Sequence, residues 1–442
     1  MAALNLPNPT ILLQPNGEDL EWVNQNTAIL VAHGIGNQLP LETLDQFGRG
    51  LIKQYRQAFD DELSITHEIV AKPDDRGGSW FDNVLRIHKA GSDKYIDLYE
   101  YYWANYSQDK ATWKDLNSWL QGVVTGATKF YRRNELIGEQ YKDKSPFFDS
   151  KTGMFKPFRY WLFLSVIGKL FLFIDLLWRL ILWLISMIPL AGKLADILVQ
   201  AYADSLLHDL CNVISEVAIY NVFDPKSKFY DTRRQIADGA VKAITYLIER
   251  PTDDAAANKQ QLYYPSVIIA GHSLGSQVTY DAINKINLLI NMGKISTYDT
   301  DGNCTLKHKT NIAAQIKGFV TFGCPLDKIV FFLRENVPDN EYLRQQFLDN
   351  YHEFKQRDID ISTESGRYGK NLVASCGLKR MLENVPWRNY FDGKDYVSGG
   401  LDYYKGLTNI DCHFKAGRFG FTHSYYWEYD NFYKDIINNF LQ

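Results

Sequence analysis

The residues with the clearest chemical potential form one short turn, Gly271-His272-Ser273-Leu274-Gly275. A Gly-x-Ser-x-Gly sequence suits a serine nucleophile, because such a serine projects from a sharp turn that larger side chains two residues away would crowd. With the composition of this chain, the three fixed positions arise by chance about 0.1 times per sequence, so the pattern alone is weak. Its meaning depends on the elements around it.

The flanking residues give this turn the context that a nucleophile needs. Val267 to Ala270 is an apolar, largely β-branched run, which is typical of a buried strand. After the turn, apolar residues recur at Val278, Ala282 and Ile286, which is the spacing of one helix face. The N-terminus of that helix would aim the amide of Leu274 at a developing oxyanion. The alternative is a serine in an ordinary glycine-rich turn.

A second glycine-rich turn lies near the N-terminus, in Leu30-Val31-Ala32-His33-Gly34-Ile35-Gly36. Together, the two turns resemble those of lipases and esterases of the α/β-hydrolase superfamily, in which a His-Gly loop completes the oxyanion hole. The resemblance implies that the amide of Ile35 is an oxyanion donor beside that of Leu274. We expect His33 to brace its loop and not to act as the base. Supporting roles in the two turns fall to His33, Gly34, Gly271 and Gly275.

The resemblance also implies that the acid follows the nucleophile along the chain and that the base comes last. The family places its acid in a loop after a strand, and Trp387 to Phe391 has the pattern of such a strand. Asp395 follows it in an Asp-x-Val pattern like that of lipases. Asp392 is an alternative, although an Asp before Gly393 is typical of a turn. Asp327, after a Gly-x-Pro turn, is a third candidate.

Two histidines follow the candidate acids, His413 and His423. His423 directly precedes an amphipathic segment, Tyr425 to Leu441, and the family carries its base in such a loop before the last helix. His413 has the surroundings of a surface-loop residue. The expected catalytic set is therefore Ser273, Asp395 and His423, which requires no metal and no cofactor.

Both outer parts of the chain alternate between strand and helix patterns. Strands are predicted at 27–32, 95–103, 266–270, 317–322 and 387–391, with one or two more between 65 and 95, and helices at 39–59, 231–249 and 425–441. This alternation predicts an α/β fold. With the resemblance, we expect the α/β-hydrolase fold, with a mostly parallel central sheet, flanking helices and a large helical cap or lid. The expected regions are 1–104 and 226–442 for the core, and 105–225 for the insertion.

The insertion contains the most apolar segment of the chain, residues 160–190, where 24 of 31 residues are apolar. The longest charge-free run of this region, Leu180 to Gly192, has 13 residues, whereas a spanning helix needs about 20. A transmembrane anchor is therefore disfavoured. The segment is expected to lie in a bilayer interface, with a homodimer contact and a buried cap helix as the alternatives.

The composition narrows the class of protein further. The 442 residues carry a net charge of −4, which gives no general attraction to nucleic acid. The five cysteines are odd in number and lack a CxxC spacing, so neither a disulfide framework nor a zinc site is expected. The N-terminus lacks the pattern of a secretory signal, which favours a cytoplasmic or peripherally membrane-associated protein.

These patterns predict a serine lipase or esterase that hydrolyses a carboxylic ester, and the apolar segment favours a lipid or phospholipid substrate. The alternative is a non-catalytic protein of the α/β-hydrolase fold that binds membranes or other proteins, because a fold does not fix a function.

Overall fold

The computed structural model describes most of the two outer parts of the chain and shorter pieces of its middle. Described are residues 10–13, 20–36, 38–59, 62–70, 80–107, 122–128, 131, 146–166, 169, 173, 216–222, 226–249, 263–295, 297–298, 304–305, 309–326, 354–355, 379–395, 397–401, 404, 406–414 and 422–442. Of the apolar segment 160–190, only residues 160–166, 169 and 173 belong to this set.

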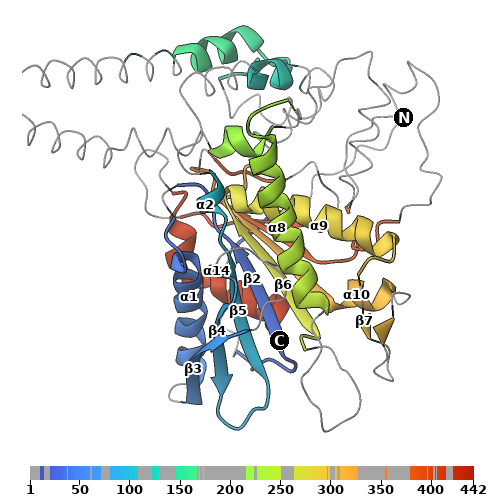
Figure 1. Cartoon of the computed structure of the whole chain (residues 1–442). Coiled ribbons are helices and arrows are strands. Elements are labelled where there is room, and N and C mark those ends of the chain that lie inside the picture. Colours follow the sequence, from blue (N-terminus) through green and yellow to red (C-terminus); the bar gives the residue numbers. More distant parts are fainter. Residues whose placement is uncertain are drawn as a thin grey trace, which may run out of the picture.

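A nine-stranded sheet forms the centre of the molecule (Figure 1). In spatial order its strands are β1 (Thr10–Leu12), β11 (Thr408–Asp411), β10 (Trp387–Phe391), β9 (Ile316–Phe322), β6 (Ser266–His272), β2 (Thr27–Ala32), β5 (Tyr95–Tyr101), β4 (Asn83–Lys89) and β3 (Leu63–Ile69). All neighbours from β1 to β5 are parallel, whereas β4 is antiparallel to both β5 and β3. Strands from both outer parts of the chain therefore share one mostly parallel sheet.

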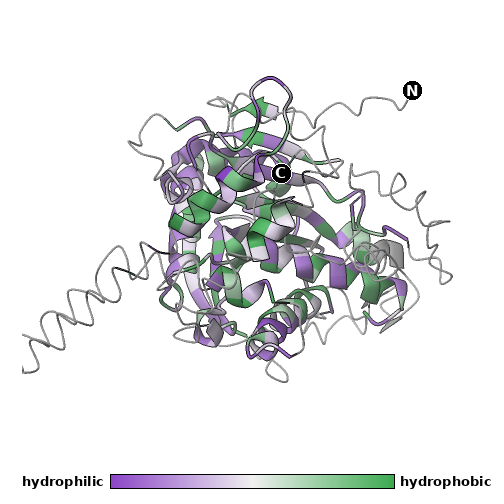
Figure 2. Cartoon of the chain, turned by 90° about the horizontal axis from the view of Figure 1, so that it is seen from above, coloured by the Kyte–Doolittle hydropathy of each residue, from purple (hydrophilic) through white to green (hydrophobic). Residues whose placement is uncertain are grey.

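Helices cover both faces of this sheet, as expected of an α/β fold (Figure 1). On one face, α8 (Tyr230–Glu249) and α9 (Leu274–Asn291) pack in a core cluster with alternate residues of β2 and β6. On the other face, α1 (Glu42–Phe59) and α14 (Asp430–Ile436) pack in a second cluster. The helices carry both hydrophobic and hydrophilic residues along their lengths (Figure 2). Such amphipathic helices bury their apolar side against the sheet.

Most predicted elements of the core are present. The strands at 27–32 and 387–391 have the predicted bounds, and the helix predicted at 39–59 begins at Glu42. The predicted helix at 425–441 is instead broken into a 3-10 turn (Tyr425–Glu428), α14 and a π-helical end (Ile437–Leu441). The break occurs because Tyr429 is extended, with φ −92° and ψ 101°.

Smaller elements complete the fold. The stretch between α9 and β9 holds a two-stranded hairpin, β7 (Thr297–Tyr298) and β8 (Cys304–Thr305), and the short helix α10 (Lys309–Gln315). A one-turn helix, α2 (Ala104–Ser107), follows β5. In the insertion, residues 122–128, 157–166 and 216–220 are helical.

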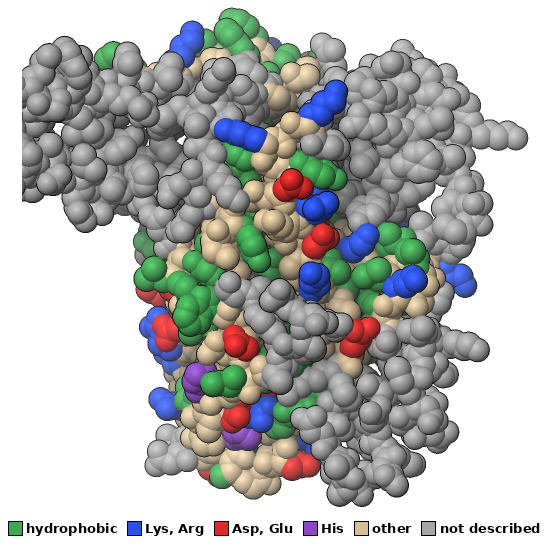
Figure 3. Space-filling view, in the orientation of Figure 1, with side chains coloured by type: hydrophobic (Ala, Val, Ile, Leu, Met, Phe, Trp, Pro, Cys, Tyr) green, Lys and Arg blue, Asp and Glu red, His purple; other side chains and the backbone are tan. Residues whose placement is uncertain are grey.

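Within the ranges given above, no helix is long and apolar enough to cross a bilayer. On the face of the molecule in Figure 3, acidic and basic side chains are interspersed with hydrophobic ones. The coloured part of this face therefore lacks the single-sign field that would steer a polyanion.

Candidate active site

Ser273 lies in the turn between β6 and α9, at the carboxyl end of a central strand. Its backbone has φ 50° and ψ −126°, a conformation that non-glycine residues rarely adopt and that costs about 1–3 kcal/mol. Its amide donates a hydrogen bond of 2.9 Å to the carbonyl of Phe322, the last residue of β9. The neighbouring strand thus holds Ser273 in a strained turn.

The hydroxyl of Ser273 does not stabilise the helix that follows. Ser273 is the N-cap residue of α9, where a serine side chain ordinarily accepts a hydrogen bond from an amide of the first turn, but no such bond forms. Its Oγ is buried and has no hydrogen-bond partner in the described part of the chain. Leu274 opens the helix, so its amide has no acceptor within it. A hydroxyl and an amide donor therefore lie side by side.

Glycines allow the two predicted turns to pack against each other. A Cβ on Gly34 would lie 2.7 Å from the Cβ of Ser273, so the loop after β2 touches the nucleophile turn directly. A Cβ on Gly271 would lie 2.6 Å from the carbonyl oxygen of Gly275, and one on Gly275 would collide with the carbonyl oxygen of His33. These three positions cannot hold a side chain without moving the turns apart.

His33 braces its own loop. Its Nε2 accepts hydrogen bonds from the amides of Trp103 (2.9 Å) and Ala104 (3.2 Å), so the ring proton resides on Nδ1. Nδ1 lies 2.6 Å from the carbonyl oxygen of Gly34, to which it donates. Burial lowers the pKa of His33 to about 4, although the bond to Gly34 opposes this. Both nitrogens are occupied, which leaves His33 no capacity to act as a general base.

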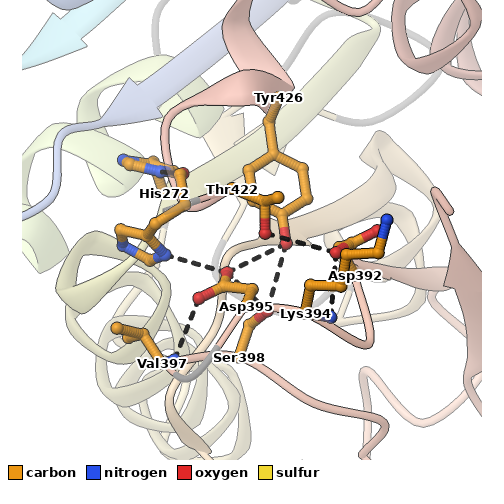
Figure 4. A network of polar contacts seen from close by, with 9 residues as sticks. His272, Asp392, Lys394, Asp395, Val397, Ser398, Thr422 and Tyr426 are labelled. Carbon is orange, nitrogen blue, oxygen red and sulfur yellow. Dashed lines mark hydrogen bonds and ion pairs between the residues drawn. The ribbon is translucent and has the colours of Figure 1, made fainter. Parts of the chain in front are cut away.

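Asp395 lies at the centre of a polar network in the loop after β10 (Figure 4). Its Oδ2 accepts hydrogen bonds from Nδ1 of His423 (2.9 Å), the hydroxyl of Ser398 (2.7 Å) and the hydroxyl of Tyr426 (3.0 Å). Its Oδ1 accepts from the amide of Val397 (2.9 Å). The structure therefore brings together the predicted acid and base, 28 residues apart in the sequence.

The electrostatics of this network orient the imidazole. Burial raises the pKa of Asp395, but the hydrogen bond and charge of His423, with the donors Ser398 and Val397, outweigh burial and hold it below its usual range. An ionised carboxylate only accepts hydrogen bonds, so Nδ1 of His423 carries a proton. In the neutral ring Nε2 is then the basic nitrogen. Nε2 is buried and, among the described residues, has no hydrogen-bond partner.

The imidazole of His423 lies beside the nucleophile turn. A Cβ on Gly323, directly after β9, would lie 2.9 Å from Cε1 of His423. The rings of His272 and His423 are 4.9 Å apart between centroids. No hydrogen bond joins the hydroxyl of Ser273 to His423 in this structure, and among the described residues each of the two atoms is without a partner. Hydrogen bonds of this kind often close only when substrate is bound.

Asp392, the second candidate acid, organises the loop. Its carboxylate accepts hydrogen bonds from the amides of Lys394 (2.9 Å) and Phe414 (2.7 Å) and from the hydroxyl of Thr422 (3.2 Å). These bonds fix the start of the acid loop against the segment that leads to His423 (Figure 4). Asp392 therefore has the turn-forming role that its position before a glycine indicates.

His413, the second candidate base, takes no part in this network. It is exposed, and its amide donates a hydrogen bond to Asp411 at the end of β11. The third candidate acid, Asp327, lies outside the described residues. The structure therefore pairs Asp395 with His423 and leaves His413 at the surface.

Three residues of the site have no clear signal in the sequence. The hydroxyls of Tyr426 and Ser398 both donate to Asp395, and their oxygens lie 3.1 Å apart. His272 lies 3.1 Å through Nε2 from the carbonyl oxygen of His423, and because a carbonyl only accepts, Nε2 must donate. Burial, and then the nearby charge of His423, lower the pKa of His272 to about 3, so its ring is neutral. His272 thus ties the loop of the base to the nucleophile turn.

This arrangement has the groups that acyl transfer needs. They are the hydroxyl of Ser273, an imidazole nitrogen oriented by the carboxylate of Asp395, and the backbone amide of Leu274 at the start of α9. Comparisons with known proteins add no relative: no family model matches, and no curated protein or solved structure shows significant similarity. What the site does has therefore to be argued from its own sequence and geometry.

Proposed function

We propose that the chain is a serine hydrolase of the α/β-hydrolase fold that cleaves a carboxylic ester through an acyl-enzyme on Ser273. The observation that carries this proposal is the buried hydroxyl of Ser273, without a partner among the described residues and held in a strained turn beside the His423–Asp395 pair. Strain and unpartnered buried polar groups cost stability, and both cluster at functional sites.

The order of the elements supports the same fold. Ser273 follows β6, near the middle of the sheet, Asp395 follows β10, and His423 follows β11. Because these strands are parallel, their carboxyl ends meet at one edge, where ligands bind in open α/β sheets. The sequence order of nucleophile, acid and base is that of the α/β hydrolases.

The proposed reaction follows from the geometry. The Oγ of Ser273 attacks the acyl carbonyl while Nε2 of His423 takes its proton, and Asp395 stabilises the imidazolium. The amides of Ile35 and Leu274 hold the oxyanion. His423 then protonates the leaving alcohol. Water, deprotonated by His423, attacks the acyl-enzyme, and the acid leaves as the proton returns to Ser273.

A lipid ester is the proposed substrate class. In the described part of the insertion, Phe158, Leu162, Phe163 and Val166 are exposed on one short helical stretch, and exposed Arg159 lies among them. An apolar surface with a nearby cation fits the interface of a bilayer that contains anionic lipids. We propose that this stretch lets the enzyme reach lipid esters at a membrane surface.

Labelling with a fluorophosphonate probe tests the nucleophile. Wild type is expected to be labelled and to hydrolyse short-chain p-nitrophenyl esters, and Ser273→Ala to do neither. His423→Ala is expected to lose labelling, whereas the exposed His413→Ala serves as the matched control and keeps it. An unlabelled wild type, or equal labelling of Ser273→Ala, would favour the non-catalytic binding protein.

A lipid panel tests the substrate class. Vesicles that contain phospholipids and neutral glycerides are incubated with wild type or Ser273→Ala, and released fatty acids are measured by mass spectrometry. Release by wild type alone is expected. Hydrolysis of soluble esters without release from any lipid would restrict the function to that of a soluble esterase.

A further inference from the structure

The end of the insertion reaches into the candidate active site through Glu216. Its Oε2 accepts a hydrogen bond of 2.8 Å from the amide of Gly36, in the loop after β2. Its Oε1 accepts one of 3.1 Å from the hydroxyl of Ser107, at the end of α2. The residue is only 4% exposed. A carboxylate from the insertion is thus hydrogen-bonded to the loop that carries Ile35.

The segment that carries Glu216 is fixed to the nucleophile helix. The side chains of Asn221 and Gln277 exchange two hydrogen bonds, of 2.7 and 3.3 Å. The hydroxyl of Tyr220 donates to Asp281 at 3.1 Å. Gln277 and Asp281 lie in the first two turns of α9. The carboxylate of Glu216 holds the loop after β2 that carries Ile35 (the oxyanion loop). The segment of Glu216 is in turn bonded to α9, the helix of which Ser273 is the N-cap.

The bond from Gly36 has a consequence for the amide before it. Gly36 has φ +118°, a conformation that L side chains rarely adopt, so the loop turns sharply there. Glu216 engages the amide of Gly36, and within the described residues no hydrogen bond engages the amide of Ile35. Only the two backbone dihedral angles of Ile35 separate the peptide planes that carry these amides, so holding the Gly36 amide restricts the direction of the Ile35 amide.

Stability alone gives no reason to keep a carboxylate here. Burial raises the pKa of Glu216 to about 7, although Gly36 and Ser107 act in the opposite direction. Because the pKa of Glu216 is higher in the folded than in the unfolded chain, the folded state becomes less stable as the pH rises from the ordinary pKa of a glutamate toward 7. A buried carboxylate that destabilises the fold indicates a functional role, here the positioning of the groups to which it is hydrogen-bonded.

We propose that Glu216 is a positioning residue of the oxyanion loop, through which the end of the insertion sets the direction of the Ile35 amide. This inference rests on the proposed function, because it assumes that an oxyanion forms at Ser273. It assigns the insertion a part in the chemical step in addition to any part in reaching the substrate.

The test uses the full-length chain with Glu216→Ala, Glu216→Gln and the matched control Asp149→Ala. Asp149 is another acidic residue of the insertion, ion-paired with Lys156 at 3.0 Å. For Glu216→Ala, kcat on a soluble p-nitrophenyl ester is expected to fall about 10-fold to 100-fold with KM unchanged. This is less than the ~10²–10³-fold cost of removing an oxyanion donor, because the Ile35 amide is misaligned and not removed. Affinity for a boronic acid that mimics the tetrahedral intermediate is expected to fall by a factor similar to that of kcat.

Glu216→Gln keeps an acceptor for the Gly36 amide and is expected to recover most of the lost kcat, while Asp149→Ala retains wild-type values. Wild-type kcat and boronate affinity in Glu216→Ala would overturn the inference, as would a glutamine variant as defective as the alanine variant. A purely structural role predicts a lower thermal midpoint with unchanged kcat per labelled molecule, which also overturns it. If wild type neither hydrolyses esters nor reacts with the fluorophosphonate, the proposed function itself fails.

Discussion

Buried carboxylates lie toward both ends of the parallel strands, and their partners differ in kind. Asp97, near the start of β5, accepts two hydrogen bonds from Arg86, at 2.6 and 2.7 Å, and one from Tyr264 at 2.5 Å. Arg86 also bonds to Tyr263 at 2.9 Å. At the other end, Asp395 bonds to an imidazole whose second nitrogen has no partner among the described residues.

This difference separates a structural pair from a candidate catalytic one. Arg86 is a permanent cation whose planar fork matches the carboxylate of Asp97, so the pair fixes β4 to β5 and has no proton to transfer. The partner of Asp395 is an imidazole, which can accept a proton and release it again. Asp97 and Asp395 accept similar numbers of hydrogen bonds. Mutation of Asp395 is nevertheless expected to lower mainly activity, and mutation of Asp97 mainly stability.

The largest expected effect is on activity, at the end that carries Ser273. In Asp395→Asn, the amide nitrogen can donate to Nδ1 of His423 and favour the wrong tautomer, so kcat is expected to fall by about 10⁴-fold. Ester hydrolysis per mole of folded protein measures this. Asp392→Asn, three residues earlier in the same loop, is the matched control and is expected to lower stability more than kcat. Equal losses of kcat in the two variants would remove the distinction between them.

The second effect is on stability, at the opposite end. In Asp97→Asn, the partly exposed guanidinium of Arg86 loses its matching charge, which is expected to lower the free energy of unfolding by about 1–3 kcal/mol. Urea unfolding measures this loss, and fluorophosphonate titration counts the folded active sites. kcat per titrated site is expected to remain that of wild type. A large loss of kcat per site would show that Asp97 also serves catalysis, and the two aspartates would no longer differ in role.

The end of the sheet that carries Ser273 also responds to acid. Burial lowers the pKa of His33 to about 4 and that of His272 to about 3. In the unfolded chain both take up protons below about pH 6.5, whereas in the folded chain they remain neutral down to the lower values. The unfolded state therefore binds more protons, and stability falls as the pH drops through 6.5 toward 4.

His272→Gln should reduce this slope. Between pH 6 and 4, the free energy of unfolding of wild type is expected to fall by about 1.4 kcal/mol more per pH unit than that of the variant. Urea unfolding across this range measures the difference. The exposed His413→Gln is the control and should follow the wild-type curve. If the free energy of unfolding fell equally with pH in wild type and His272→Gln, the imidazole of His272 would not be held neutral in the folded chain.

The elements around Ser273 were predictable because they are buried and parallel. Strands β2 and β6 are covered on both faces, so they consist of apolar runs that stand out from their surroundings. Strands β1 and β11, at one side of the sheet, were not predicted. They are three and four residues long, and in β11 the buried Asn409 accepts hydrogen bonds from the side chain of Asn389 and the amide of Leu401. A strand held partly by buried amides lacks the hydrophobic pattern.

The resemblance to α/β hydrolases was enough to predict the candidate acid and base, and the structure brings Asp395 and His423 into contact. Residues that act through them were not predicted. Glu216 is 180 positions from its partner Gly36, and nothing local marks a glutamate that folding brings to a distant loop. The apolar segment 160–190 gave the strongest compositional signal, and most of it lies outside the described residues.

The smallest expected effect concerns the strain at Ser273. Among the described residues around Asp97, no residue other than glycine has such a positive φ. The φ of 50° at Ser273 costs a side chain about 1–3 kcal/mol that glycine avoids, while glycine loses about 0.5–1 kcal/mol of unfolded-chain entropy. Ser273→Gly is therefore expected to exceed Ser273→Ala in free energy of unfolding by about 1 kcal/mol, as measured in urea. Both variants lack the nucleophile, so activity cannot explain the difference. If alanine were the more stable of the two, the turn would be relaxed, and the position of Ser273 would owe nothing to selection for a reactive geometry.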